Sequence, residues 1–296
     1  MISIGNKVLK LLIHEPLDGF YQGTRFDRSG VFGSVQWNGV EMAGRWFSSY
    51  DPRMHDAVCG PAEEFSPIGF DEAAPGGCFV KIGVGLLERP DAEAYDRFRL
   101  YPVSDPGTWT VEAGERSVVF THRLDGIYLY RKEIVVAGPG SFHIRHSLES
   151  LGAPLSGEVY NHNFWTFGRF EVGPGRLIDF PFRPEGTWRA EYDSVGFTGG
   201  GVRFSRTLRE GESVYCGNIH KEGTSGMPYS MSVSDGPVSV LIRGNVPVTH
   251  TVLWSNHRIA CLEPYNDFAT PFFWEIEYRF DNYNIHQNPD ISLSES

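Results

Sequence analysis

Cysteines and long apolar runs are both scarce in this sequence. The four cysteines among 296 residues, Cys59, Cys78, Cys216 and Cys261, include no Cys-x-x-Cys pair. This excludes a disulfide scaffold and gives no zinc signature, and we expect the thiols to be reduced and buried. No apolar stretch approaches the roughly 20 residues needed to cross a bilayer.

Positive charge is also in deficit. Lys and Arg number 26 against 37 Asp and Glu, giving a formal charge of −11. An acidic surface repels nucleic-acid phosphates and anionic lipids, so we expect neither nucleic acid nor membrane as a partner. A local basic pocket stays possible. Lys10 interrupts the first apolar run and no small-residue cleavage site follows it, so we expect no signal peptide and a soluble, cytoplasmic protein.

Helical periodicity is nearly absent, since the best helical candidate is the short segment 92–96. The 34 glycines, 19 prolines and 14% aromatic residues favour strands joined by tight turns instead. Strand-like runs recur about every 10–15 residues, which is typical of an all-β sandwich or barrel. These runs are 31–37, 79–87, 109–112, 117–122, 128–136, 142–148, 238–242 and 273–280.

No linker or repeat divides the chain. The glycines 199–201 lie between apolar residues and predict a turn, not a hinge, and the polar end 288–296 predicts a frayed tail. We therefore expect a single β-domain over residues 1–296. His143 and His146 fall on opposite sides of an expected strand, so no metal site is predicted.

The first candidate for chemistry is the run Tyr160-Asn161-His162-Asn163-Phe164-Trp165. Amide side chains can orient an imidazole, and aromatic rings provide faces on which sugars stack. His162 is therefore either a general acid or sugar ligand, or a core histidine with satisfied hydrogen bonds.

The second candidate is Glu263, which lies between the apolar strand end 259–262 and Pro264. Partial desolvation there would raise the pKa of its carboxyl group and suit it to proton abstraction. The alternative is a solvated turn glutamate.

Two further polar clusters come earlier in the chain. Glu63 and Glu64 point to opposite faces if extended, so at most one faces a pocket. In Gly23-Thr24-Arg25-Phe26-Asp27, we expect Arg25 and Asp27 to share one strand face and to bind a polyol or to form a structural salt-bridge turn.

Together these segments resemble the aldose 1-epimerase (galactose mutarotase-like) family. Asn161-His162-Asn163-Phe164 is similar to the family's Asn-His-x-aromatic segment, and Glu263-Pro264 is similar to its Glu-Pro segment. The run 272–280 is similar to the family's closing strand, and Arg25 corresponds to its early sugar-binding arginine. The resemblance implies a β-supersandwich of large antiparallel sheets with a concave cleft, His162 as general acid and Glu263 as general base.

The sequence departs from the family pattern in three places. The segment 60–72 lacks the histidine of a Leu-His-Gly motif, the binding aspartate is either Asp179 or Asp193, and the Pro-Gly-Glu before the last strand becomes Pro-Phe-Phe. These differences indicate a divergent subgroup.

The resemblance implies an enzyme that interconverts the anomers of an aldose, with no metal or organic cofactor. Arg25, Glu64, Asp71 and Asn161 would bind the sugar hydroxyls, and Trp165 would stack on the ring. We expect the His162–Glu263 pair to favour imidazolium and carboxylate.

Two alternatives stay open, because a fold does not fix a reaction. One is another sugar enzyme on the same scaffold, an epimerase, lyase or hydrolase, which the Glu63-Glu64 pair motivates. The other is a non-catalytic carbohydrate-binding protein. In all three cases the expected partner is a small carbohydrate.

Overall fold

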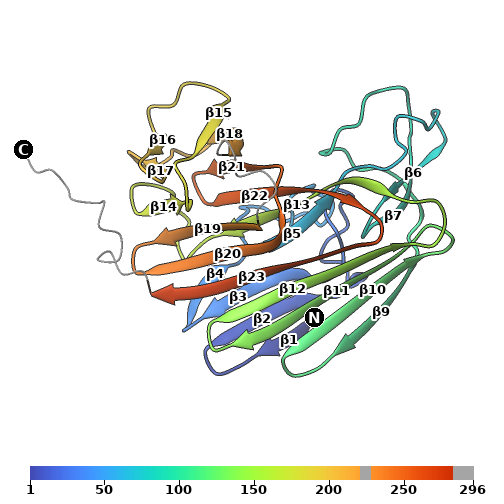
Figure 1. Ribbon diagram of the computed structural model, residues 1–296, viewed down its shortest axis with the longest axis horizontal. Coiled ribbons are helices and arrows are strands. Elements are labelled where there is room, and N and C mark those ends of the chain that lie inside the picture. The colour runs from blue at the N-terminus through green and yellow to red at the C-terminus, as the bar shows by residue number, and fades with distance from the viewer. Residues whose placement is uncertain (221–227, 283–296) are drawn as a thin grey trace, which may run out of the picture.

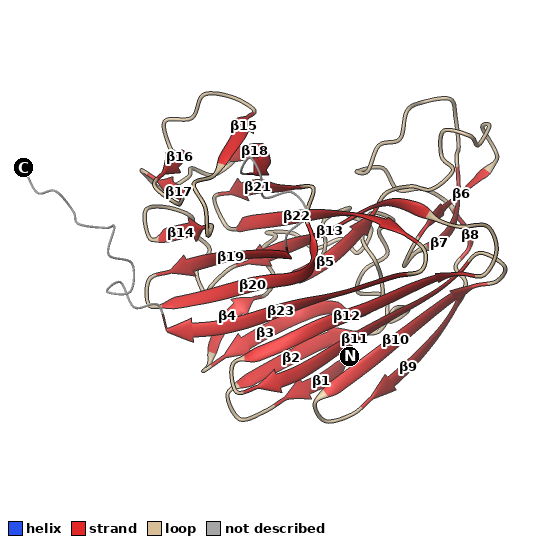
Figure 2. Cartoon of the chain, in the orientation of Figure 1, coloured by secondary structure: helices blue, strands red, loops and turns tan. Residues whose placement is uncertain are grey.

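The computed structural model describes residues 1–220 and 228–282, and in this part of the chain every regular element is a β-strand (Figures 1 and 2). The all-β prediction is confirmed. No helix in the described residues is long and apolar enough to cross a membrane. The predicted frayed tail, 288–296, lies outside the described residues.

Two large antiparallel sheets dominate the structure. The first, of six strands, has the order β15 (Glu185–Trp188), β18 (Ser213–His220), β21 (His250–Asn256), β22 (Ala260–Ala269), β13 (Ser156–Trp165) and β5 (Gly60–Phe65). The second, of ten strands, has the order β16 (Val195–Thr198), β17 (Gly201–Phe204), β14 (Arg176–Asp179), β19 (Pro228–Asp235), β20 (Val238–Pro247), β23 (Phe272–Asn282), β12 (Ser141–Ser150), β11 (Tyr128–Gly138), β10 (Ser117–Leu124) and β9 (Thr108–Ala113).

Two smaller sheets complete the architecture. One contains β1 (Ile2–Gly5), β2 (Leu9–His14), β3 (Val31–Trp37) and β4 (Val40–Ala43), and the other contains β6 (Cys78–Lys81), β7 (Gly85–Glu88) and β8 (Val103–Asp105). Figure 1 shows β1–β3 beside β10–β12, where the Phe32 and Phe142 rings lie 5.7 Å apart. The largest apolar cluster extends from Ile4 to Phe280.

The six-stranded sheet packs one of its faces against the ten-stranded sheet. Trp165 of β13 lies 5.8 Å, ring to ring, from both Tyr278 and Phe280 of β23. The ring of Phe65 on β5 packs edge-on against that of Trp274 on β23, with 6.0 Å between ring centroids. Because side chains alternate along a strand, the residues next to Phe65 and Trp165 point away from this core.

Most of the predicted strands are present, with two local differences. The run 79–87 is a hairpin of β6 and β7, because Gly83 adopts a φ of 77° and turns the chain. The best helical candidate, 92–96, forms no helix: these residues lie in the loop between β7 and β8, which the Arg89 guanidinium fixes through the carbonyls of Phe70 and Ala73. The Gly199–Gly201 turn joins β16 to β17. All four thiols are free, and Cys78 is exposed where burial was expected.

A group of charged side chains lies between the two large sheets. Glu63 of β5 contacts Lys132 of β11, and its other oxygen accepts bonds from His146 at 3.0 Å and from the Asn161 amide at 2.9 Å. Asp27 lies 3.5 Å from Lys132. Burial raises the pKa of Glu63, but Lys132 and His146 overcome it and lower that pKa to about 2.

Asp27 thus has a structural role, and one of our expectations is corrected. Residues 24–28 form a loop, not a strand. Arg25 and Asp27 therefore do not share a strand face: Asp27 faces Lys132 in the core, while Arg25 contacts Glu64.

We expect Lys132→Met to lower the free energy of unfolding by about 3–5 kcal/mol, because it leaves Glu63 and Asp27 buried without their cation. Arg131 precedes it on β11 but is 45% exposed, so Arg131→Met should change stability by less than about 1 kcal/mol. Urea denaturation of both variants measures the difference, and equal effects would contradict a buried ionic contact.

Candidate active site

The outer face of the six-stranded sheet carries the candidate site, and strand register brings its two central residues together. On β13 and β22, Tyr160 pairs with Tyr265 and Asn163 with Leu262. The same register places His162 opposite Glu263. Two segments about 100 residues apart in sequence are therefore neighbours because their strands pair.

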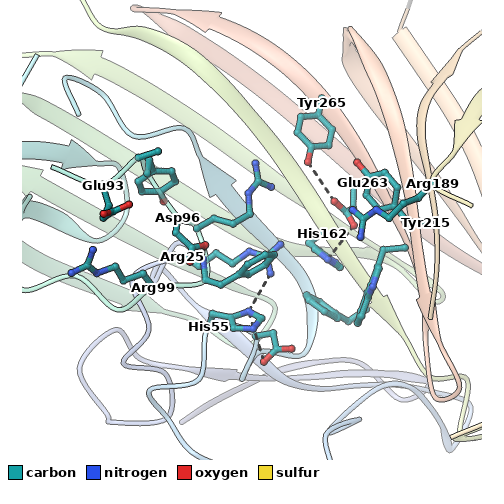
Figure 3. Close-up of a pocket in the computed structure, with 17 residues that line it drawn as sticks. Arg25, His55, Glu93, Asp96, Arg99, His162, Arg189, Tyr215, Glu263 and Tyr265 are labelled. Atoms are coloured by element: carbon teal, nitrogen blue, oxygen red, sulfur yellow. Dashed lines mark hydrogen bonds and ion pairs between the residues drawn. The ribbon is translucent and has the colours of Figure 1, made fainter. Parts of the chain in front are cut away.

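The imidazole and the carboxyl group are in direct contact. His162 Nε2 lies 3.1 Å from Glu263 Oε1, and the Tyr265 hydroxyl lies 3.5 Å from Glu263 Oε2 (Figure 3). Phe164 stacks on the imidazole at 3.9 Å between ring centroids. His162 Nδ1 has no hydrogen-bond partner among the described residues. The ring is therefore held by stacking and by one polar contact.

Burial decides the protonation of this pair. It raises the pKa of Glu263 to about 8, and it lowers the pKa of His162 well below its usual range, with further repulsion from Arg25 and Arg97. Both shifts favour neutral side chains, opposite to the carboxylate and imidazolium expected from sequence, because desolvation penalises both charged forms. At neutral pH the pair thus holds one proton, on Glu263.

The pair forms part of the floor of a cavity of about 1040 Å³. The opposite wall is the loop between β7 and β8, from Glu93 to Arg99, and exposed residues such as Phe98 border the opening. Figure 3 shows Arg189 and Tyr215 beside Glu263, with Arg25 and His55 across the cavity. A small polar molecule of hexose size fits this volume.

Arg25 and Glu64, both predicted to bind the sugar, contact each other, but only Arg25 lines the cavity. Arg25 Nε donates to Glu64 Oε2 at 2.6 Å, and Arg25 Nη2 donates to the Tyr160 hydroxyl at 2.8 Å. Tyr160 also contacts Glu64. Arg25 lines the cavity, and Glu64 lies behind it and fixes its guanidinium. Glu63 faces the core, as alternation along β5 requires.

Besides Glu64, three more residues predicted to bind the sugar do not line the cavity. Asn161 and Trp165 are on the opposite face of β13 from His162, where Asn161 donates to Glu63 and Trp165 is fully buried in the core. Alternation along the strand could have excluded both. Asp71 is exposed and does not line the cavity.

The cavity also contains residues that sequence reasoning missed. Arg97 lines it from the loop, and Arg189 lies over the Tyr215 ring at 4.0 Å. Trp254 of β21 lines the cavity, with its ring 5.9 Å from that of His162. Trp254 could have been found from the sequence, because it follows the apolar pair Val252-Leu253 that predicts a strand. The loop and turn positions of the two arginines carried no such signal.

The departures from the family pattern are resolved in part. Asp179 contacts Arg203, and Asp193 pairs with Arg206 at 2.5 Å, so neither aspartate lines the cavity. A second histidine does line it: His55 Nδ1 lies 3.4 Å from Arg25 Nη1. It precedes the segment 60–72 that the resemblance indicated.

Neither a protein-family model nor a curated protein sequence matches this chain. Solved structures do. The Slr1438 protein from Synechocystis sp. PCC 6803 superimposes with a TM-score of 0.53 at 13% identity, over 95% of this chain and 96% of that one.

Two further solved structures are similar to this chain. A galactose mutarotase-like protein from Lactobacillus casei ATCC 334 gives a TM-score of 0.51 at 12% identity, over 96% of this chain and 100% of the other. Galactose 1-epimerase from Lactobacillus acidophilus NCFM gives a TM-score of 0.52 at 9% identity, over 95% of this chain and 94% of the other. The chain therefore has the galactose mutarotase-like fold.

Proposed function

We propose that this protein is an aldose 1-epimerase, which interconverts the α and β anomers of a free sugar by general acid–base ring opening. The observation that carries the proposal is the contact between His162 and Glu263 on the cavity floor. Ring opening needs one proton removed and one donated, and this pair can do both. The fold shared with a galactose 1-epimerase agrees with it.

The proton held by the pair supplies the reactive state. When this proton moves from Glu263 to His162 along their 3.1 Å contact, it leaves a carboxylate and an imidazolium. No proton has to be taken up from solvent. Glu263 then removes the proton from the C1 hydroxyl, and His162 donates its proton to the ring oxygen as the bond from C1 to that oxygen breaks. Rotation about C1–C2 and the reverse transfers close the ring as the other anomer.

Other cavity residues have positions suited to holding the sugar. Arg25 presents its guanidinium at the wall, where Glu64 and Tyr160 orient it. Trp254, in place of Trp165, offers an aromatic face beside His162. Apolar sugar faces stack on aromatic rings, while guanidinium groups donate to hydroxyl oxygens.

The main competing reaction, hydrolysis of a glycoside, normally uses two carboxyl groups in separate roles. Glu64 is held by Arg25 and Lys81, which together with Arg97 overcome the effect of burial and lower its pKa. It is therefore a poor proton donor to a leaving group. Glu63 is outside the cavity, which removes the second acid–base pair that the two adjacent glutamates suggested.

We expect Glu263→Gln and His162→Asn each to lower kcat/KM for anomer exchange by about 10²–10⁴-fold, the usual contribution of a general acid or base. Polarimetry and magnetisation-transfer NMR on a panel of aldoses measure the rate. Asp267→Asn is the matched control, because Asp267 is an exposed residue on β22. Wild-type rates equal to those of both variants on every sugar would overturn the proposal.

The pH profile tests the protonation state. Because the pKa of Glu263 is raised to about 8, the pair keeps its single proton through neutral pH and loses it above that value. We expect kcat/KM, corrected for the uncatalysed reaction, to fall as pH rises through about 8. A rate that keeps rising through that pH would show that the proton of the pair is not required.

A further inference from the structure

Three cationic groups share a single carboxylate: Arg25 and Arg97 line the cavity, and Lys81 lies buried behind them. Glu64 lies 2.6 Å from Arg25 Nε, 3.6 Å from Lys81 Nζ and 3.7 Å from Arg97 Nε. Across residues 1–220 and 228–282, no other carboxylate lies within 4.0 Å of these three cations. The three cations thus carry two positive charges more than the single carboxylate balances.

This excess is costly because most of it is buried. The side chains of Arg25 and Lys81 are 8% and 1% exposed, and buried charges in proteins are normally paired. Burial, followed by repulsion from Arg97 and Arg25, lowers the pKa of Lys81 to about 8 in spite of Glu64. The lysine is still largely protonated at neutral pH, so the positive charge persists.

The remaining carboxyl groups of the cavity do not neutralise this wall. Glu263 is mostly protonated at neutral pH, since burial raises its pKa to about 8. Glu93 and Asp96 are exposed at the rim, where water screens their charge. Asp56 also lines the cavity, but it lies 4.0 Å from the His55 imidazole and forms no ion pair with the three cations. Arg99, on the same loop, is already paired with Asp91 at 2.6 Å.

We infer that the natural ligand is a sugar bearing an anionic group, a carboxylate or a phosphate, which contacts the Arg97 guanidinium. Of the three cations, Arg97 is the most accessible, with 39% of its side chain exposed. Guanidinium groups bind carboxylate and phosphate oxygens through paired, charge-assisted hydrogen bonds. The inference rests on the proposed function and names the substrate class of the same site.

The position of Arg97 suits one end of a sugar whose other end is at the acid–base pair. Arg97 Nη1 donates to the Tyr160 hydroxyl at 3.1 Å, and the Tyr160 ring stacks on Tyr265 at 4.3 Å. The Tyr265 hydroxyl in turn contacts Glu263. The anionic group and C1 would therefore lie along this tyrosine pair. The negative net charge of the protein does not exclude binding of an anion here, because the excess of positive charge is local to this part of the cavity.

Calorimetric titration with matched sugars tests the inference. Glucose, galactose and mannose are each compared with the corresponding uronate and 6-phosphate, at fixed ionic strength. We expect one anionic series to bind at least about tenfold more tightly than its neutral parent, as a charge-assisted bond implies. A preference for uronates identifies a sugar acid, and a preference for the 6-phosphates identifies a phosphorylated sugar.

Two arginine variants locate the effect. Arg97→Gln should reduce the anionic preference, the ratio of the two affinities, to less than about twofold. Arg99→Gln removes an equal charge from the same loop, where Asp91 already balances it, and should keep the preference. Loss of the preference in both variants would indicate a general field effect and would overturn the role of Arg97.

Anomer exchange measured on the same sugars separates this inference from the proposed function. Exchange of neutral sugars with no tighter binding of any anionic sugar overturns the inference and leaves the epimerase proposal intact. Tight binding of an anionic sugar that depends on Arg97, without exchange of any sugar, supports the ligand class and overturns the epimerase proposal.

Discussion

The pairing of β13 with β22 is the constraint on which the site depends. It brings an imidazole and a carboxyl group to 3.1 Å, with only 3% and 6% of the two side chains exposed to water. Removing water penalises both charged forms, so a single proton belongs to the pair as a unit. A pair that can give and take a proton in one contact matches the two transfers of sugar ring opening, and it needs no change in its total charge.

Alternation along the strands divides polar side chains between two separate roles. Glu64 faces the cavity wall and fixes Arg25, whereas its neighbour Glu63 faces the core and binds Lys132. On β13, His162 lines the cavity, whereas Asn161 donates to Glu63 on the core side. The charged group around Glu63 and Lys132 thus contacts the face of β13 opposite to His162. Packing between the two sheets and the geometry of the site are therefore linked through this one strand.

Charge at the site differs from charge on the whole molecule. The protein carries a formal charge of −11, yet at and behind one wall of its cavity Arg25, Lys81 and Arg97 surround a single glutamate. Contacts of a few ångströms in a buried setting outweigh distant surface charges, which water and salt screen. The ligand class is therefore better judged from this wall than from composition.

Sequence alone determined the elements and the central pair. Glycine- and proline-rich turns and alternating apolar residues specify strands locally, and they predicted the runs of β3, β10, β11, β12 and β23. The order of the segments with His162 and Glu263 indicated the fold. Sequence could also have excluded Trp165, since its parity on β13 differs from that of His162.

Only the tertiary structure decided the walls of the cavity and the protonation of the pair. His55 and Arg97 come from loops whose position depends on long-range contacts, such as those that Arg89 makes to the carbonyls of Phe70 and Ala73. No local pattern encodes where such loops lie. The pKa of Glu263 likewise depends on how much water the packed chain removes from it, a quantity that exists only once the strands and loops are assembled.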